Sequence, residues 1–181
     1  MPRIFTGIEI PPATRDALAM LRGGLPGARW IDPENYHLTL RFVGDVDGRT
    51  ADEIAEMLSL VQRQPFQLEV AGVGFFGSRP PHALIARMVP SPELSELQAE
   101  HERLMQRLGL RPEARKYAPH VTLARLRRTN EKQMASHLSE QGGVAIPPFS
   151  VDQFALFSAR ESVGGGPYFV EAAYPLSGEA T

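Results

Sequence analysis

The sequence His37-Leu38-Thr39-Leu40 occurs a second time, with one change, as His120-Val121-Thr122-Leu123, 83 residues further along the chain. Both copies continue into apolar-rich sequence that contains an arginine, Arg41 after the first copy and Arg125 after the second. A separation close to half of the 181 residues indicates two related lobes. The arguments about fold and function therefore start from these two segments.

Each copy has the pattern of a half-buried strand. Side chains alternate between the two faces of a strand, so His37 and Thr39 point the same way, and so do His120 and Thr122. If the two strands lie side by side, two imidazoles and two hydroxyls converge on one cleft. The alternation also predicts a set of core-facing side chains, which are Leu38, Leu40, Phe42, Val121 and Leu123.

Two imidazoles and two hydroxyls around one cleft suit the cleavage of a phosphodiester. A neutral imidazole can take a proton from an attacking water, while a protonated one gives a proton to the leaving oxygen. Histidine serves both roles because its unperturbed pKa lies near neutrality. Threonine hydroxyls can donate hydrogen bonds to the non-bridging oxygens, where negative charge builds up. We expect this chemistry to need no metal ion and no other cofactor.

The arginines after the two copies are candidate substrate ligands. Arg41 is two residues beyond Thr39 and has the same parity, so we expect it to reach the cleft. Arg125 has the opposite parity to Thr122, so simple alternation points it away. A bulge or a strong twist can turn it back.

The second copy lies in a basic segment. Between residues 111 and 128 there are six basic residues and one acid, Glu113, in a chain whose net charge is −2. Such a segment can hold nucleic-acid phosphates without reading the base sequence. Single-stranded RNA is also recognised by the stacking of bases on aromatic rings, for which the candidates are Phe5, Phe42, Tyr117 and Tyr168.

Helices and further strands are expected around the two segments. Amphipathic patterns predict helices over about residues 12–24, 50–62, 92–108 and 130–138. Apolar and alternating runs predict strands at residues 4–10, 66–70, 83–88, 154–157 and 168–174. Many strands are joined by Gly/Pro turns, which favours an antiparallel or mixed sheet and an α+β class. We expect one domain over residues 1–181, with its most flexible loop at residues 159–167.

Composition narrows the functional class. The chain has no cysteine, which excludes disulfides, thiolate metal sites and thiol nucleophiles. Its apolar stretches are far shorter than the ~18 residues that cross a bilayer. The amino terminus shows no signal-peptide pattern. We therefore expect a soluble, cytoplasmic monomer with no membrane partner.

The two segments resemble the His-x-Thr-x signatures of the two-histidine (2H) phosphoesterase superfamily. Within it, the chain is most similar to the bacterial and archaeal RNA 2′,3′-cyclic phosphodiesterases, also called 2′-5′ RNA ligases. The flanking sequence resembles this family as well, at residues 30–36 and 42–45 around the first segment, 117–119 and 124–125 around the second, and 154–157 and 166–168 near the end.

The resemblance implies a bilobal α+β fold, with two pseudo-symmetric antiparallel sheets flanked by helices and a central active-site cleft. It implies hydrolysis of RNA 2′,3′-cyclic phosphate ends to 2′-phosphomonoesters, with His37 as the general acid and His120 as the general base. Thr39 and Thr122 would hold the phosphate, and the family match favours a role for Arg125. The reverse reaction would join the cyclic phosphate to a 5′-hydroxyl through a 2′-5′ linkage.

Two alternative functions remain open at this point. A second branch of the superfamily acts on 2′-5′ oligonucleotides or on a cyclic phosphate of ADP-ribose, and a non-catalytic module can keep such a cleft to bind RNA ends. Hydrolysis of a 2′,3′-cyclic nucleotide in the presence of a chelator distinguishes an enzyme from a binding module. The position of the product phosphate, 2′ or 3′, distinguishes the enzymatic branches.

Overall fold

A computed structural model describes residues 3–77, 81–141, 145–159 and 166–177. Its main sheet has eight strands, which are β1 (Arg3–Glu9), β2 (Ala28–Trp30), β3 (His37–Asp45), β5 (Val70–Phe76), β6 (Ala83–Met88), β7 (His120–Leu126), β9 (Gln153–Ala159) and β10 (Phe169–Pro175). The order is β10-β9-β1-β3-β7-β6-β5, with β2 paired to β7, and all these pairings are antiparallel. The predicted α+β class with antiparallel strands is confirmed.

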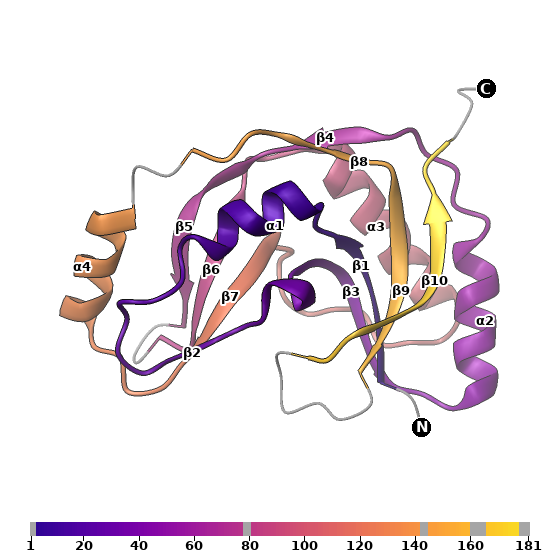
Figure 1. Ribbon diagram of the computed structural model, residues 1–181. Helices are drawn as coiled ribbons and strands as arrows, with labels where there is room; N and C mark the ends of the chain where they lie inside the picture. Colours follow the sequence, from indigo (N-terminus) through magenta and orange to yellow (C-terminus); the bar gives the residue numbers. More distant parts are fainter. Residues whose placement is uncertain (1–2, 78–80, 142–144, 160–165, 178–181) are drawn as a thin grey trace.

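The sheet has two halves that meet at the two motif strands. One half contains β10, β9, β1 and β3, and the other contains β7, β6 and β5. In Figure 1 the first half lies next to α2 (Gly48–Leu58) and the second extends toward α4 (Glu131–Gln141). The described pairing between β3 and β7 is Leu38 with Val121, which hold the same position in the two motif copies. The two halves are therefore related by an approximate two-fold axis at this pair, as expected for two related lobes.

The helices form where capping residues and apolar spacing coincide. In α3 (Pro92–Arg107), the Ser91 hydroxyl accepts a hydrogen bond from the Leu94 amide at 3.2 Å, and Pro92 occupies the first turn. Its buried residues recur at helical spacing and pack against β3. The Asp47 carboxylate caps α2 in the same way, accepting from the Thr50 amide at 2.7 Å.

Several element boundaries differ from expectation; α2, for example, ends at Leu58 rather than at residue 62. Helix α1 (Pro12–Ala19) ends before Gly23, so the predicted extension to residue 24 is wrong, although Leu21 is buried beyond it. The strand expected at 66–70 is interrupted at Glu69: β4 (Phe66–Leu68) pairs with β8 (Phe149–Val151), and β5 begins at Val70.

Two further sequence expectations concern the loop at 159–167 and membrane insertion. The loop lies mostly outside the described residues. Within the described ranges, every helix is too short or too polar to cross a bilayer.

Both motif strands contain a β-bulge at the fourth residue of the motif. In the pairing of β1 with β3, Thr6 faces Arg41 and Gly7 faces Thr39, so Leu40 is skipped. In the pairing of β6 with β7, Leu84 faces Ala124 and Ile85 faces Thr122, so Leu123 is skipped. A skipped residue inverts the alternation of the side chains that follow it, up to the next irregularity, which in β3 is at Val43. The bulges therefore decide which residues after each threonine face the cleft.

Candidate active site

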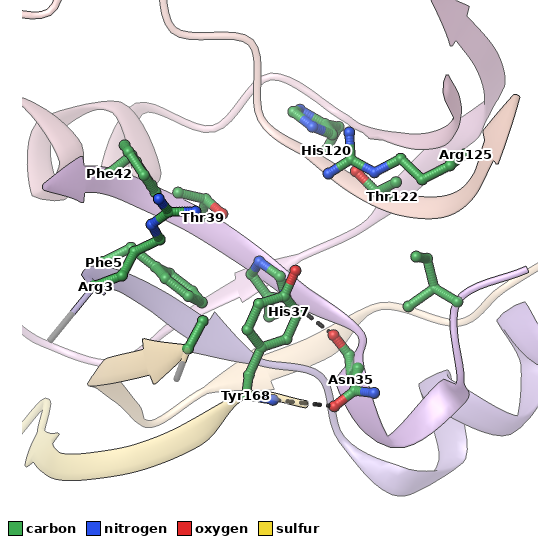
Figure 2. Close-up of a pocket in the computed structure, with 12 residues that line it drawn as sticks. Arg3, Phe5, Asn35, His37, Thr39, Phe42, His120, Thr122, Arg125 and Tyr168 are labelled. Carbon is green, nitrogen blue, oxygen red and sulfur yellow. Dashed lines mark hydrogen bonds between the residues drawn. The ribbon is translucent and has the colours of Figure 1, made fainter. Parts of the chain in front are cut away.

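The two motif copies meet at one cleft. Figure 2 shows His37 and Thr39 on β3 across the cleft from His120 and Thr122 on β7. The cavity between them has a volume of about 220 Å³. Its lining includes all four predicted motif side chains together with Arg3, Phe5, Asn35, Phe42, Arg125 and Tyr168.

Both histidines are held by backbone carbonyl groups two residues earlier in the chain. His37 Nδ1 lies 3.0 Å from the Asn35 carbonyl oxygen, and His120 Nδ1 lies 2.7 Å from that of Ala118. A carbonyl oxygen only accepts hydrogen bonds, so Nδ1 of each ring carries the proton that is donated. In the neutral state Nε2 is then the basic nitrogen of each imidazole.

The bulges place Phe42 and Arg125 at equivalent positions beside the cleft. Each is five residues beyond its motif histidine, and each lines the cavity. Alternation predicted that Phe42 would face the core, but its side chain is 51% exposed. That prediction is wrong because the strand skips Leu40. The skipped Leu123 has the opposite consequence for Arg125, which it brings to the cleft.

Arg41 does not line the cleft itself, which differs from the expectation based on its parity, but it lies in the wall of a larger groove that adjoins the cleft. The same bulge turns its side chain inward, where it is 7% exposed. Its guanidinium pairs with the Glu102 carboxylate and donates to the backbone oxygens of Phe42 and Arg111. Arg41 therefore ties β3 to α3 and to the segment that precedes the second motif.

His37 lies in an enclosed, aromatic environment. Its ring centroid is 4.8 Å from that of Phe5, 4.7 Å from that of Tyr168 and 5.9 Å from that of Phe157. This burial lowers the pKa of His37 to about 4, and the nearby charges of His120 and Arg125 act in the same direction. The unliganded site therefore favours a neutral imidazole at position 37.

His120 is less enclosed and has cations nearby. The ring of Phe76 packs edge-to-face against it, with the two ring centroids 4.4 Å apart. Burial lowers the pKa of His120, the hydrogen bond to Ala118 opposes this, and Arg87 and Arg125 lower it further. Because His120 also contributes to lowering the pKa of His37, the two rings are electrostatically coupled across the cleft.

Comparison with known proteins agrees with this geometry. A family model described as LigT like Phosphoesterase matches residues 8–85 and 88–168, so each matched segment contains one motif copy. The chain belongs to this family. Each matched segment contributes strands to both halves of the sheet, since residues 8–85 contain β3 and β5 and residues 88–168 contain β7 and β9.

Several curated relatives of this LigT-like chain share one name. An RNA 2′,3′-cyclic phosphodiesterase of Aeropyrum pernix is 33% identical over 78% of the chain and 81% of the relative. A protein of the same name from Thermotoga maritima is 32% identical over 80% of the chain and 77% of the relative. Among solved structures, E. coli LigT complexed with 3′-AMP superposes with a TM-score of 0.78 at 23% identity, covering 98% of this chain and 99% of that one. This last similarity shows that the fold is shared.

A larger groove adjoins the LigT-like cleft on the side of His120. It has a volume of about 780 Å³ and shares Thr39, Phe42, His120, Thr122 and Arg125 with the cleft. Part of the predicted basic segment lines it, namely Arg115, Lys116 and Arg125, together with Glu113. Arg127 and Arg128 line neither cavity, so only part of the basic segment faces the site.

The four aromatic candidates for stacking lie in different environments. Phe42 lines the cleft and is exposed, and Tyr168 lines it and is partly buried. Phe5 is buried, and its ring stacks nearly parallel on that of Phe157. Tyr117 faces the groove, and its hydroxyl donates to the Thr39 carbonyl oxygen at 2.7 Å. Burial raises the pKa of Tyr117, which keeps the hydroxyl protonated as a donor. Tyr117 thus links the second motif segment to the first motif strand.

Two polar cleft residues, Arg3 and Asn35, were not predicted from the sequence. Arg3 follows the alternation of β1 with Phe5, so its position on the cleft face was readable from period-two spacing. The Asn35 side chain accepts a hydrogen bond from the Tyr168 amide at 3.4 Å and packs on Gly166, whose φ is +101° (Figure 2). This contact joins residues 133 positions apart, so local sequence does not signal it.

Proposed function

We propose that this LigT-like protein hydrolyses RNA ends that carry a 2′,3′-cyclic phosphate and releases a 2′-phosphomonoester. The observation that carries the proposal is the pair of imidazoles that line one cleft, each with Nδ1–H bound to a backbone carbonyl and each with a motif threonine beside it. The shared name of the curated relatives supports the choice of RNA cyclic phosphates. The geometry of the cleft and the name of the curated relatives therefore support the same reaction.

The proposed reaction is a single displacement at phosphorus. A water oxygen attacks the phosphorus while Nε2 of neutral His120 takes its proton, and the bond from phosphorus to O3′ breaks as Nε2–H of protonated His37 gives a proton to O3′. The product keeps its phosphate on O2′. The proton that His120 gained and the one that His37 lost are exchanged with solvent before the next turnover.

Three groups in the cleft can stabilise charge on the non-bridging oxygens. The hydroxyls of Thr39 and Thr122 are donors from the two strands, and Arg125 adds a positive charge at the cleft wall. Charge-assisted contacts of this kind strengthen as negative charge develops in the transition state. An anionic phosphate also favours the protonated form of His37, which offsets the cost of burying that charge.

The groove beside His120 suits the rest of the RNA. Arg115 and Lys116 are exposed along it, and Phe42 lies at its junction with the cleft, where a base can stack. Cationic side chains hold phosphates independently of base sequence. We propose that the same residues support the reverse reaction, in which a 5′-hydroxyl takes the place of water beside His120.

Incubation of the purified protein with an oligonucleotide ending in a 2′,3′-cyclic phosphate, in the presence of a chelator, tests the proposal. We expect conversion to a 2′-phosphate end, identified by end-group analysis of the product. A 3′-phosphate product would contradict the assignment of O3′ as the leaving group. Tight binding without turnover would instead identify an RNA-end-binding module.

A further inference from the structure

Arg87 lies directly opposite His120 in the sheet. In the antiparallel pairing of β6 with β7, the two residues are register partners. Directly paired residues of antiparallel strands project from the same face, with Cβ atoms about 4.5–5.5 Å apart. Arg87 does not line the catalytic cavity or the groove, so it is not placed to contact substrate.

The Arg87 guanidinium is held in a defined place by strand β5. Its terminal nitrogen donates to the Phe75 carbonyl oxygen at 3.3 Å, and its carbon lies 5.4 Å from the centroid of the Phe76 ring. That same Phe76 ring packs edge-to-face against His120. A Cβ atom on Gly74 would lie 2.5 Å from the Arg87 Nε atom, so glycine at this position makes room for the guanidinium. Gly74, Arg87, Phe76 and His120 therefore form a contiguous set.

The other half of the sheet has a different charge at the equivalent position. The register partner of His37 in the pairing of β1 with β3 is Glu9, where the partner of His120 is Arg87. Phe157 on β9 corresponds to Phe76 on β5, since each is separated from its motif strand by one intervening strand. Otherwise similar frameworks thus place an anion beside one histidine and a cation beside the other.

We propose that Arg87 is a positioning residue that disfavours a proton on His120 and so keeps this imidazole ready to accept one from the nucleophile. A cation close to an imidazole destabilises the imidazolium form. The guanidinium is suited to this task because it stays charged at every pH at which the protein is folded. The inference rests on the proposed role of His120 as the general base.

Other titratable and charged groups line the two cavities that His120 borders. From its own strand and from the opposite half of the cleft these are Arg125, His37, Arg3 and Tyr168. From the groove they are Arg41, His82, Glu113, Arg115, Lys116 and Tyr117. The charges identified as lowering the pKa of His120 are those of Arg87 and Arg125. Arg125 faces the substrate, so Arg87 is the one of these two whose charge can be altered without removing a group from the cleft.

The pH dependence of kcat/KM for Arg87→Gln tests the proposal. When a base must be neutral and an acid protonated, the rate on the acidic side depends on the pKa of the base, and the rate on the alkaline side does not. Removing the cation raises the pKa of His120. We therefore expect the ascending limb to move to higher pH by about 0.5 unit, which means that kcat/KM at a given acidic pH is about threefold lower. The descending limb should stay unchanged.

Three variants separate charge from structure. Arg87→Lys keeps the charge and should retain most of the original ascending limb. Gly74→Ala keeps the arginine but displaces its guanidinium, so it should move the ascending limb part of the way. Arg103→Gln removes an exposed charge on α3 at a residue that lines neither cavity, and it should leave both limbs in place. The displacement should also shrink at about 1 M salt, where the Debye length is only ~3 Å.

Two results would overturn the proposal. An equal loss of kcat/KM on both limbs of Arg87→Gln would show that Arg87 supports the fold alone. A displacement of the descending limb would show that the group beside Arg87 acts as the acid. Either result is distinct from failure of the proposed function, which would appear as the absence of cyclic phosphate hydrolysis by the unaltered protein.

Discussion

The two halves of the sheet carry the same motif strand but surround its histidine differently. The ring of His37 lies among three aromatic side chains and borders a recess of about 130 Å³ whose lining includes Glu9, Glu34 and Arg15. The ring of His120 contacts Phe76 and borders a groove of about 780 Å³ that includes Arg115 and Lys116. Both strands share the bulge at the fourth residue of the motif, and β3 has a second one at Val43.

This difference shows how a repeated motif can place two histidines in unlike environments. The repeat supplies an imidazole with a fixed tautomer and a hydroxyl from each half. The neighbours then set how readily each imidazole takes a proton and what can approach it. An enclosed ring suits contact with the ribose of the substrate, and a ring at the edge of an open groove suits the approach of a nucleophile.

The largest expected effect comes from removing either imidazole. His37→Ala and His120→Ala should each lower kcat by about 10²–10⁴, because each removes one proton transfer from the same step. The double variant should be little slower than the slower single variant, since groups that act together are not additive. Turnover of a cyclic-phosphate oligonucleotide measures this, with circular dichroism as the control for folding.

The same two variants should differ in stability. His37→Ala leaves a cavity among Phe5, Phe157 and Tyr168 and should lower the free energy of unfolding by about 2 kcal/mol. His120→Ala opens toward the groove, where water can fill the space, and should cost less. Equal losses in denaturant titrations would argue against the asymmetry of the two environments.

A second prediction contrasts the two arginines after the motifs. Arg41→Met leaves the Glu102 carboxylate without its cationic partner and should lower the free energy of unfolding by about 2–3 kcal/mol. Arg125→Met should change stability by only about 0.5 kcal/mol or less but lower kcat/KM by about tenfold or more. Thermal unfolding and steady-state kinetics on both variants check this, and a catalytic defect without destabilisation in Arg41→Met would contradict it.

That contrast also marks where sequence reasoning succeeded and where it failed. Alternation along a strand was sufficient to place His37 with Thr39 and His120 with Thr122. It failed at Arg41 and Phe42, because the bulge at Leu40 depends on pairing with β1, more than thirty residues away in the chain. A local pattern contains no information about which residue a distant partner strand will skip.

Contacts between distant segments explain the residues that were missed. The Asn35 side chain meets the backbone of Tyr168, and the Tyr117 hydroxyl meets the backbone of Thr39. Neither contact follows from a period or from a charge pattern. The helices were easier to predict, because their caps and apolar spacing are local, as at Ser91 and Asp47.

A third prediction concerns the charged groove that only the His120 half has. Arg115→Ala combined with Lys116→Ala should raise KM for an oligonucleotide substrate by about threefold to tenfold at low salt. The logarithmic dependence of KM on salt should also become shallower by about one unit, since fewer phosphates are neutralised. The matched control is Arg127→Ala with Lys132→Ala, which removes two charges that line neither cavity. A salt dependence that is the same in both variants would argue against RNA in the groove.

The pH profile gives the smallest and most direct comparison of the two histidines. Burial lowers the pKa of both rings, to about 4 for His37, so kcat/KM, which reports the free enzyme, should follow a bell centred below the unperturbed histidine value of about 6.5. The two limbs belong to the coupled pair of rings. An anionic phosphate favours the imidazolium form of each ring, so the bell for kcat should lie at higher pH than the bell for kcat/KM. Initial rates over a range of substrate concentrations at each pH separate the two profiles. A kcat/KM profile that is flat, or centred above neutrality, would mean that the aromatic enclosure of His37 does not control its proton.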